Sequence, residues 1–188
     1  GVELSLNSVN VQTSNFTWRT SFNISFQENE ILELTQDEVL NGSKRWREGT
    51  DRYQFYIREF AGVNTATGMP MWYKVETDEN GNEVKVPTEN YNNATRTEQG
   101  SALPEYYGGF SNDFNFFGFD ASIFFYYSIG GQVLDYDEMQ LMHNGSDPGQ
   151  QLSQDVLDAW KEPGDVSDVP RFVVDNSYQF NERSTRFL

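Results

Sequence analysis

The stretch that decides the fold runs from Pro104 to Asp135 and reads PEYYGGFSNDFNFFGFDASIFFYYSIGGQVLD. Along it an aromatic, apolar face alternates with a polar face, first up to Phe117-Gly118-Phe119 and then again beyond it. Because successive side chains of a strand point to opposite faces, this period of two predicts two β-strands joined by a tight glycine turn. Each arm keeps the alternation for about ten residues, longer than the usual strand and long enough for a tilted strand to cross a bilayer.

The first part of the chain repeats the pattern. Val2–Val11 and Phe16–Phe26 alternate in the same way on either side of a polar turn at Thr13-Ser14-Asn15. The second arm collects Phe, Trp, Phe, Ile and Phe on one face, interrupted by Thr20, and places Arg19 on the other. Such a face fits lipid, whereas a sandwich core mixes in more Val and Leu. On the strand pattern alone, both a membrane barrel and a hairpin from a soluble sandwich or jelly roll remain open.

Composition narrows the classes of function. The chain has 188 residues, enough for one domain, and a net charge of −16 from 13 basic and 29 acidic side chains, which repels nucleic acid and anionic membrane surfaces. The absence of cysteine excludes disulfides, thiolate chemistry and cysteine zinc sites. The single histidine, His143, lies in a polar loop where we expect it to be solvated. We therefore predict no cofactor and no metal site.

Two further observations concern location. No apolar run reaches the about 18 residues of a transmembrane helix, which leaves a membrane protein built from strands open. The N-terminal residues Gly1–Leu4 lack the basic and apolar regions of a signal peptide. From this start we expect a cytosolic chain, a mature one or a piece of a longer protein.

Between the two hairpins we expect polar loops with short strands. Gln27–Gly49 reads as a loop with an apolar anchor at Ile31, Leu32 and Leu34, and Pro87–Ala102 reads as a second loop. Strand character returns at Arg52–Val63, Met71–Val75 and Glu83–Val86.

The segment Asp78–Asn82 predicts a hairpin turn, because Asn80-Gly81 is the dipeptide typical of a type I′ turn. Asp78, Asn80 and Asn82 also have the spacing that opens a calcium loop. The glycine and the bidentate glutamate of such a loop do not follow at the required positions, so we favour the turn.

After Asp135 the chain is polar and irregular apart from one helical signal. Within Leu152–Lys161, Ser153 can cap a helix with Asp155 in its first turn, and Pro163-Gly164 would stop it. We expect one short helix at this position.

Short and long connections alternate along the chain. Thr13–Asn15, Asn64–Gly68 and Phe117–Phe119 are short, and long polar loops lie between them. A transmembrane barrel has this asymmetry, with tight turns on one side and long loops on the other. We therefore predict that Phe117–Phe119 is a periplasmic turn and that Pro104 and Asp135 lie toward the cell exterior.

Four segments carry a resemblance to a known family: GVELSLNSVNVQTSNFTWRTSFNISFQENEILEL, EFAGVNTATGMPMWY, the stretch LPEYYGGFSNDFNFFGFDASIFFYYSIGGQVLD and LDAWKEPGDVSDVPRF. In this order they resemble the C-terminal barrel region of the SusC/RagA family of TonB-linked outer-membrane proteins of Bacteroidetes. The resemblance covers nearly the whole chain.

The resemblance implies an all-β fold: antiparallel up-and-down strands that form part of a transmembrane β-barrel, with long extracellular loops. It implies a location in the outer membrane of a Gram-negative bacterium and a role in TonB-dependent nutrient uptake. The imported substrate would be a glycan, an oligosaccharide or a peptide, delivered by a SusD-like surface lipoprotein. Since residues 1–188 contain no TonB box, no plug domain and no final barrel strand, we expect a partial barrel that meets the TonB complex only through parts outside this sequence.

Six residues are candidates for ligand or partner binding. Trp46, Trp72 and Trp160 lie in or beside the long loops, where they either stack on sugar rings or a partner or simply anchor the loops to the rim. Arg19, Asp113 and Asn115, together with Asp120, should face the barrel lumen, where contact with a plug is favoured over contact with substrate.

Two other classes of function remain as alternatives to the transporter. A soluble carbohydrate-binding β-module would use the same aromatic residues as a stacking platform. A glycosidase needs two carboxylates at a defined separation, and the scattered acidic residues single out no pair. We therefore predict no enzymatic activity and no catalytic residue.

Overall fold

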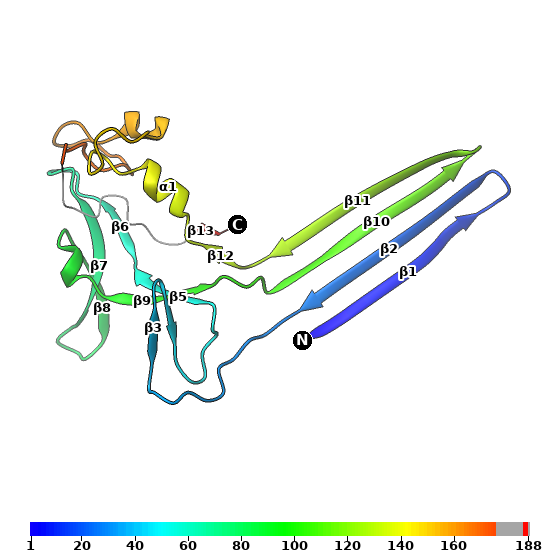
Figure 1. The fold of residues 1–188 in the computed structure, drawn as a ribbon, viewed down its shortest axis with the longest axis horizontal. Coiled ribbons are helices and arrows are strands. Elements are labelled where there is room, and N and C mark those ends of the chain that lie inside the picture. The colour runs from blue at the N-terminus through cyan, green and yellow to red at the C-terminus, as the bar shows by residue number, and fades with distance from the viewer. Residues whose placement is uncertain (176–185, 188) are drawn as a thin grey trace.

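The computed structural model describes residues 1–175 and 186–187 and has two parts (Figure 1). A long four-stranded sheet occupies one end of the molecule, and a module of shorter strands and loops occupies the other. The sheet takes its strands from both predicted hairpins. The module is built from the long connections that follow them.

The sheet consists of β1 (Val2–Gln12), β2 (Phe16–Phe26), β10 (Tyr106–Phe116) and β11 (Phe119–Ile129), antiparallel and in that order. Each strand has 11 residues, so the prediction of two long alternating hairpins is confirmed. The central pair, β2 and β10, comes from segments far apart in the chain, and its register is unbroken from Phe26 opposite Tyr106 to Phe16 opposite Phe116. A bulge between Val9 and Val11 interrupts the register of the edge strand β1.

Both hairpin turns lie at the end of the sheet remote from the module (Figure 1). The turn after β10 contains two residues, Phe117 with φ 48° and Gly118 with φ 84°. Two positive φ angles are the pattern of a type I′ turn, which matches the right-handed twist of the strands. Glycine adopts this conformation freely, whereas a side chain with a Cβ is disfavoured by about 1–2 kcal/mol.

The sheet is a single layer. Every residue of β1 except Val11 is exposed, and so is every residue of β11 except Tyr127, because no second sheet in the described part of the chain covers either face. A soluble sandwich would bury one face against a second sheet about 10 Å away. The soluble alternative is therefore not favoured by the structure.

The module contains two small sheets. One has the order β3-β4-β5-β9 and the other β6-β7-β8. The buried apolar side chains of the module are Trp72, which is only 1% exposed, and Phe55, Val63, Met69 and Ala94. The strands are β3 (Val39–Asn41), β4 (Lys44–Trp46), β5 (Gln54–Arg58), β6 (Phe60–Val63), β7 (Pro70–Thr77), β8 (Glu83–Thr88) and β9 (Arg96–Ser101), and the 3₁₀ helix η1 (Tyr91–Asn93) follows β8.

Strand character at Arg52–Val63 is confirmed, and it is divided between β5 and β6, which belong to different sheets. The expectations for the two loops of this region were wrong. The loop expected at Gln27–Gly49 contains the β3–β4 hairpin, and Leu32 is 81% exposed rather than an anchor. The loop expected at Pro87–Ala102 contains β9, whose polar sequence forms a strand because β5 supplies its hydrogen bonds. Pairing partners far along the chain decided these elements.

The short turn at Asn64–Gly68 was expected on the same side as the turns at Thr13–Asn15 and Phe117–Phe119, and this expectation was wrong. It connects β6 and β7 inside the module, at the opposite end of the molecule from the turns of the long sheet (Figure 1). Asn64 donates its side-chain amide to Glu89 at 2.6 Å, and Thr67 donates its hydroxyl to the same carboxylate at 2.7 Å. The turn is thus part of the module's own packing.

The hairpin at Asp78–Asn82 is present, but its turn is not type I′. Only Gly81 has a positive φ, of 84°, while a type I′ turn needs two. The Asp78 carboxylate accepts the backbone N–H groups of Asn80 and Asn82, both at 2.8 Å, and so stabilises a longer loop. These hydrogen bonds, that from Asn82 first, hold the pKa of Asp78 below its usual value.

The C-terminal part packs on the module from the outside. Strand β12 (Gln132–Val133) pairs with β13 (Arg186–Phe187), and α1 (Tyr136–Leu141) follows β12. The predicted helix is a 3₁₀ helix, η2 (Gln154–Asp158), and Ser153 caps it as expected by accepting the N–H of Asp155. We call residues 142–175 the outer segment. Its small core consists of Met142, Ala159 and Val169 with Val156 packed against them.

His143 is buried, with 3% of its surface exposed, so the expectation of a solvated loop histidine was wrong. Its Nδ1 accepts the backbone N–H groups of Gly145 at 3.2 Å and Asp147 at 3.3 Å. The ring therefore organises the turn after α1.

Among the described residues, no helix combines the length and the apolar character that crossing a membrane requires.

Candidate functional site

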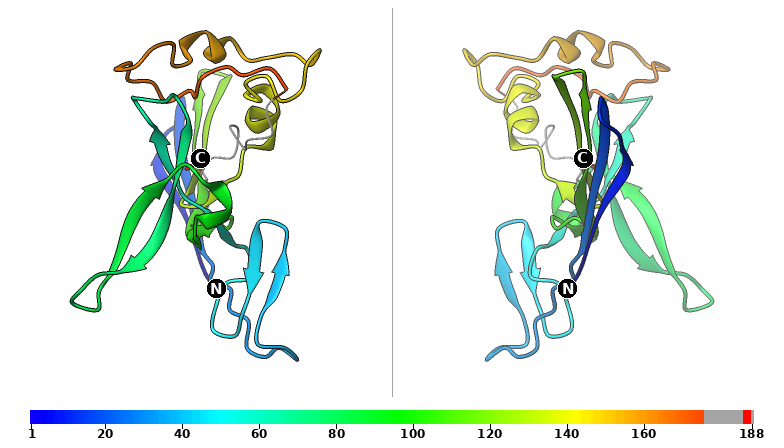
Figure 2. Two further views of the ribbon diagram at one scale, coloured as in Figure 1. Left: turned by 90° about the vertical axis from the view of Figure 1, so that its left-hand side faces the viewer. Right: turned by 90° about the vertical axis from the view of Figure 1, so that its right-hand side faces the viewer.

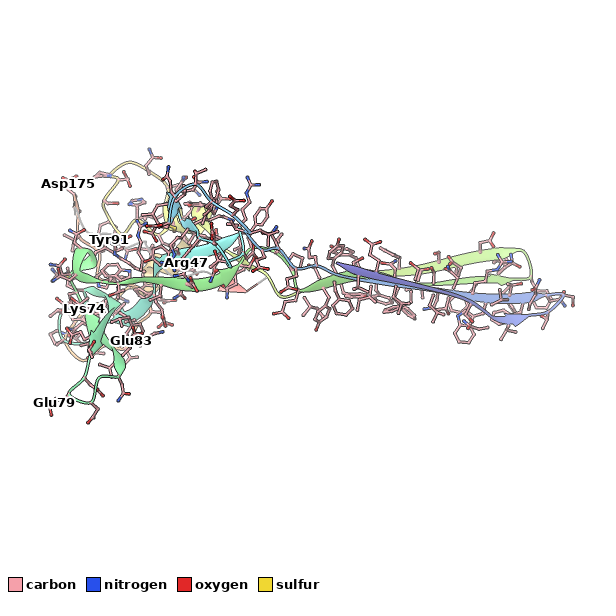
Figure 3. All side chains as sticks on the ribbon, turned by 90° about the horizontal axis from the view of Figure 1, so that it is seen from below. Arg47, Lys74, Glu79, Glu83, Tyr91 and Asp175 are labelled. Atoms are coloured by element: carbon pink, nitrogen blue, oxygen red, sulfur yellow. The ribbon has the colours of Figure 1, made fainter. Side chains whose placement is uncertain are left out.

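Side chains project from both faces of the long sheet (Figure 3), and the strand register shows that the two faces differ chemically. Strand pairing places Phe110 between Phe22 and Phe125 on one face, and Ser111 between Ser21 and Phe124 on the other. We call the first the apolar face; its members include Leu4, Leu6, Phe16, Trp18, Phe22, Ile24, Phe110, Phe114, Phe116, Phe119, Ile123 and Phe125. We call the second the polar face; its members include Ser5, Asn7, Thr17, Arg19, Ser21, Asn23, Ser111, Asp113, Asn115, Asp120 and Ser122.

Three of the six predicted site residues come together on the polar face, near the hairpin turns. Arg19 lies directly opposite Asp113 in the β2–β10 pair. Asp113 accepts the hydroxyl of Ser122 at 2.6 Å, and Asn115 donates its amide to Asp120 at 2.8 Å. These side chains line a shallow cavity of 260 Å³. Their grouping is an observation, and their role in binding stays a prediction.

Trp72 is removed from the surface by its burial. It is 1% exposed, and the edges of its ring system meet Phe60 at 6.4 Å and Tyr91 at 5.0 Å between ring centres. Trp46 is half-buried; it donates its indole N–H to the carbonyl of Arg52 at 3.0 Å, and the Arg52 guanidinium lies 5.4 Å from its ring. Trp72 offers no face to a ligand, and Trp46 is tied to its own hairpin.

Trp160 joins the outer segment to the β6–β7 turn. Its indole N–H donates to the carbonyl of Thr65 at 3.0 Å, and Gly164 donates its backbone N–H to the same carbonyl at 2.8 Å. Arg171 donates its backbone N–H to the carbonyl of Gly68 at 2.9 Å. Since these bonds link segments far apart in the chain, the indole acts as a structural clamp in this arrangement.

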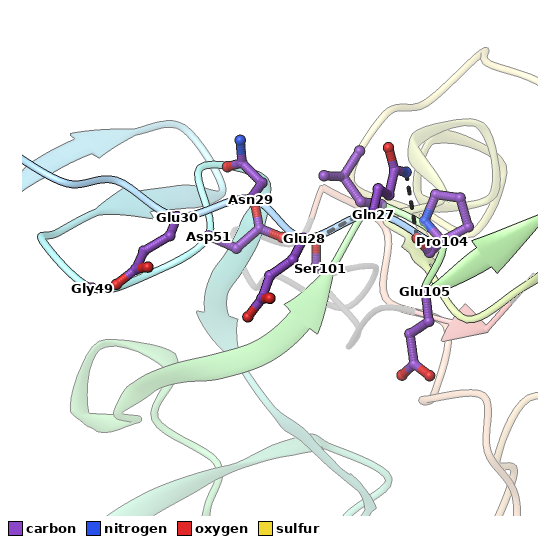
Figure 4. A pocket seen from close by; sticks show the side chains of 10 residues that line it. Gln27, Glu28, Asn29, Glu30, Gly49, Asp51, Ser101, Pro104 and Glu105 are labelled. Carbon is purple, nitrogen blue, oxygen red and sulfur yellow. Dashed lines mark hydrogen bonds between the residues drawn. The ribbon is translucent and has the colours of Figure 1, made fainter. Parts of the chain in front are cut away.

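A negatively lined pocket of 410 Å³ lies where the sheet meets the module (Figure 4). Glu28, Glu30, Asp51 and Glu105 contribute its carboxylates. One wall is held by the hydrogen bond that Gln27 donates to the carbonyl of Pro104 at 3.4 Å, and another by the bond from Ser101 to Asp51. Within the described ranges, no three Asp, Glu or His side chains are arranged to hold a metal ion.

The outer segment presents a second pocket, of 590 Å³. Its lining combines four aspartates with one lysine and two valines: Asp155, Asp158, Asp165, Asp168, Lys161, Val166 and Val169. Val166 is 91% exposed and Leu157 is 68% exposed. This end of the molecule is therefore both acidic and apolar (Figure 2 shows the outer segment lying across the module).

An ion-pair cluster orders the module. Arg45 places its guanidinium 2.6 Å from the Glu98 carboxylate and 3.9 Å from the ring centre of Tyr56. Arg47 approaches the same carboxylate at 3.4 Å. The hydrogen bond from Arg45, with smaller help from Gln54 and from the two positive charges, lowers the pKa of Glu98 below its usual value. The cluster joins β4 to β9, which the sequence places far apart.

Each face also holds residues that depart from the alternation. On the polar face, Phe124 and Tyr126 are 65% and 67% exposed. On the apolar face, Asn112 accepts both the indole N–H of Trp18 and the hydroxyl of Thr20, each at 2.9 Å. The signals were present, because Thr20 and Asn112 interrupt apolar series, but only the strand register shows that they meet.

The comparisons with known proteins agree with this architecture. No family model matches the chain. TonB-dependent receptor P3 of Formosa agariphila is 28% identical over 187 residues, covering 91% of this chain and 18% of the relative. TonB-dependent receptor P39 of the same organism is 27% identical and covers 98% of this chain and 21% of the relative. The chain thus spans about a fifth of the length of these curated relatives.

Solved structures give the same answer. The RagAB peptide transporter aligns with a TM-score of 0.77 and 28% identity over 95% of this chain and 20% of the other. The RagAB peptide importer in its closed-closed state aligns with a TM-score of 0.77 and 25% identity over 98% of this chain. The chain is therefore similar in sequence to a segment of TonB-dependent receptors and in fold to a segment of RagAB, which confirms the predicted resemblance to the SusC/RagA family.

Proposed function

We propose that this chain forms part of the barrel wall and of the extracellular module of an outer-membrane transporter, which imports a glycan, an oligosaccharide or a peptide by a TonB-dependent route. The observation that carries the proposal is the alignment with the RagAB peptide transporter over 95% of the chain. The two faces of the long sheet support it, since a barrel strand alternates apolar residues toward lipid with polar residues toward the lumen.

In this arrangement the apolar face contacts lipid and the polar face lines the lumen. The hairpin turns then lie at the periplasmic side, and the module lies outside the cell. The cavity lined by Arg19, Asp113 and Asn115 would face the lumen close to the periplasm. A plug domain supplied by the rest of the receptor is the partner we propose for it.

The partner that we propose on the outside is a SusD-like surface lipoprotein. The aligned structures are of RagAB, a peptide importer, and this chain spans about a fifth of the RagAB chain that it matches. The exposed apolar side chains Val166 and Leu157, set among aspartates, are the surface we propose for this contact. The ligand-stacking role of Trp46 and Trp160 is proposed only for the ring faces that their hydrogen bonds leave accessible.

The test uses the full-length receptor expressed with its neighbouring lipoprotein in the native host. The variant Val166→Asp should reduce recovery of the lipoprotein with an affinity-tagged receptor, while Val174→Asp, at another exposed valine of the outer segment, serves as the matched control. Growth and uptake are then measured on an oligosaccharide and on a peptide mixture as sole nutrient. Failure of the receptor to fractionate with the outer membrane would refute the proposal.

A lumenal variant separates transport from assembly. Arg19→Glu should lower uptake while leaving the amount of receptor in the outer membrane unchanged, because the side chain is exposed on the polar face of β2. If uptake is unchanged, the cluster around Arg19 does not contribute to transport.

A further inference from the structure

The two-residue turn between β10 and β11 carries an aromatic side chain in a backbone conformation that disfavours it. Phe117 has a φ of 48°. The other non-glycine residues with positive φ in the described ranges are Asn144 and Asp175, whose short polar side chains tolerate that conformation. The first central position of a type I′ turn normally holds asparagine or aspartate. Turn formation therefore does not explain the phenylalanine.

The ring of Phe117 continues the apolar face beyond the last strand pair. It meets the ring of Phe116 edge-on, with 4.5 Å between ring centres. Phe116 meets Phe16 at 6.2 Å, and Phe16 stacks on Phe114 at 6.5 Å. Phe117 itself is 64% exposed and is the terminal ring of this series. An aromatic cluster thus closes the apolar face at the end where the turns lie.

Polar groups lie beside the same cluster. Phe117 donates its backbone N–H to the carbonyl of Asn15 at 3.0 Å, which ties its turn to the polar turn between β1 and β2. In that neighbouring turn Thr13 donates its hydroxyl to the carbonyl of Phe16 at 3.0 Å. Aromatic rings on the apolar side and hydrogen-bonding groups at the tip are the combination found where a barrel meets the lipid headgroups.

We propose that Phe117 is a lipid anchor: its ring inserts at the boundary between headgroups and acyl chains of the periplasmic leaflet and fixes how deep this end of the wall lies in the membrane. The occupant is phospholipid, because the ring is continuous with the apolar face through its contact with Phe116, and the residue bonded to the Phe117 backbone, Asn15, is uncharged. This inference rests on the proposed function, which sets the orientation of the sheet.

Membrane depth tests the inference directly. In a cysteine-free version of the full-length receptor, single cysteines at positions 117, 15 and 110 carry a nitroxide label, and the protein is reconstituted in phosphatidylethanolamine and phosphatidylglycerol vesicles. Collision rates with oxygen and with a water-soluble nickel complex report depth. We expect Phe110→Cys to lie deep in hydrocarbon, Phe117→Cys just below the phosphates and Asn15→Cys in water.

The outcomes separate the anchor from the proposed function. A label at 117 that is as accessible to the nickel complex as the label at 15 overturns the anchor, while a deep label at 110 still supports the transporter. A water-accessible label at 110 would overturn the membrane orientation itself. Protection of 117 from both oxygen and nickel would indicate contact with protein and would likewise overturn the lipid anchor.

A second variant distinguishes anchoring from turn strain. Phe117→Asn relieves the strain because asparagine suits the turn, so unfolding in detergent micelles should be no faster than in the native receptor. In vesicles the same variant should unfold about fivefold faster, since the ring no longer transfers from water into the interface. Phe124→Asn, at an exposed ring on the polar face, should show no difference between micelles and vesicles. Equal effects of Phe117→Asn in both media would contradict the anchor.

Discussion

Tyr127 lies over Gly108 and reaches across the sheet. Its hydroxyl donates to the carbonyl of Asn23 at 2.7 Å, so a residue of β11 is bonded to β2 over the intervening strand β10. A Cβ at position 108 would lie 2.1 Å from that carbonyl oxygen and 2.5 Å from the Tyr127 hydroxyl oxygen. The glycine is what allows three strands to be joined by one side chain.

We therefore expect Gly108→Ala to disturb the central strand. The added methyl group meets backbone as well as the phenol, and overpacking of this kind destabilises by about 1–3 kcal/mol. Heat-induced loss of the compact band on an unboiled gel measures the effect in the full-length receptor. Gly109→Ala is the matched control, because a Cβ there first meets the far end of the Phe124 ring, at 2.9 Å. Equal stability of the two variants would contradict the argument.

Gly68→Ala should loosen the outer segment. A Cβ at this position would lie 2.3 Å from Cε3 of Trp160, and the φ of 71° adds backbone strain. We expect faster tryptic cleavage after Lys161, measured on the full-length receptor in membranes. Gly149→Ala carries similar strain, with a φ of 93°, but has nothing within 4 Å, and it should be cleaved as slowly as the native protein. Equal acceleration by both changes would show that strain and not the Trp160 contact holds the segment.

Asn112→Leu should destabilise the long sheet. The change leaves the indole N–H of Trp18 and the hydroxyl of Thr20 without their shared acceptor, on the face that we assign to lipid. Hydrogen bonds between side chains in membranes contribute about 0.6–2 kcal/mol, so a loss of this size is expected in unfolding titrations of the reconstituted receptor. Asn115→Leu on the polar face removes one bond to Asp120 in a watery setting and should have a smaller effect. A larger loss for Asn115→Leu would argue that the faces are assigned the wrong way round.

The module should loosen in acid. Because the pKa of Glu98 is lowered in the folded state, its contribution to stability is present above its ordinary value of 4.5 and is lost as the pH falls below it. The segments around β4 and β9, which Arg45 and Glu98 join, should therefore become more sensitive to protease as the pH falls below 4.5. Glu98→Gln should be sensitive already at neutral pH and should lack the acid step, whereas Glu76→Gln, which removes the partner of Lys74 on the β7–β8 hairpin, should keep it. If Glu98→Gln still becomes more sensitive to protease at low pH, the loss of stability in acid is caused by other carboxylates.

Local sequence was sufficient for the long hairpins. The alternation at Phe16–Phe26 and Tyr106–Phe116 predicted both the strands and their two faces, because a strand's side-chain period depends only on backbone geometry. It also placed Arg19, Asp113 and Asn115 on one face. The N-cap at Ser153 could also be predicted, because its side chain bonds to the backbone only two residues away, at Asp155.

The module was poorly predicted because its strands are short and polar. β9, from Arg96 to Ser101, has no apolar alternation and becomes a strand only by pairing with β5. The turn at Asn64–Gly68 was grouped with the turns of the long sheet, yet it connects β6 and β7 inside the module, where Asn64 and Thr67 donate hydrogen bonds to Glu89. No local signal distinguished these cases.

The sequence by itself determined the two long hairpins and the separation of an apolar from a polar face, since each face follows from residue spacing alone, and the structure gives each of the four strands 11 residues. Only the tertiary structure decided which segments meet across long stretches of chain. It showed that Trp160 clamps the β6–β7 turn, that Trp72 is core, and that Phe117 ends a continuous aromatic cluster. Such contacts depend on strand register and on packing between distant segments, which no local pattern encodes.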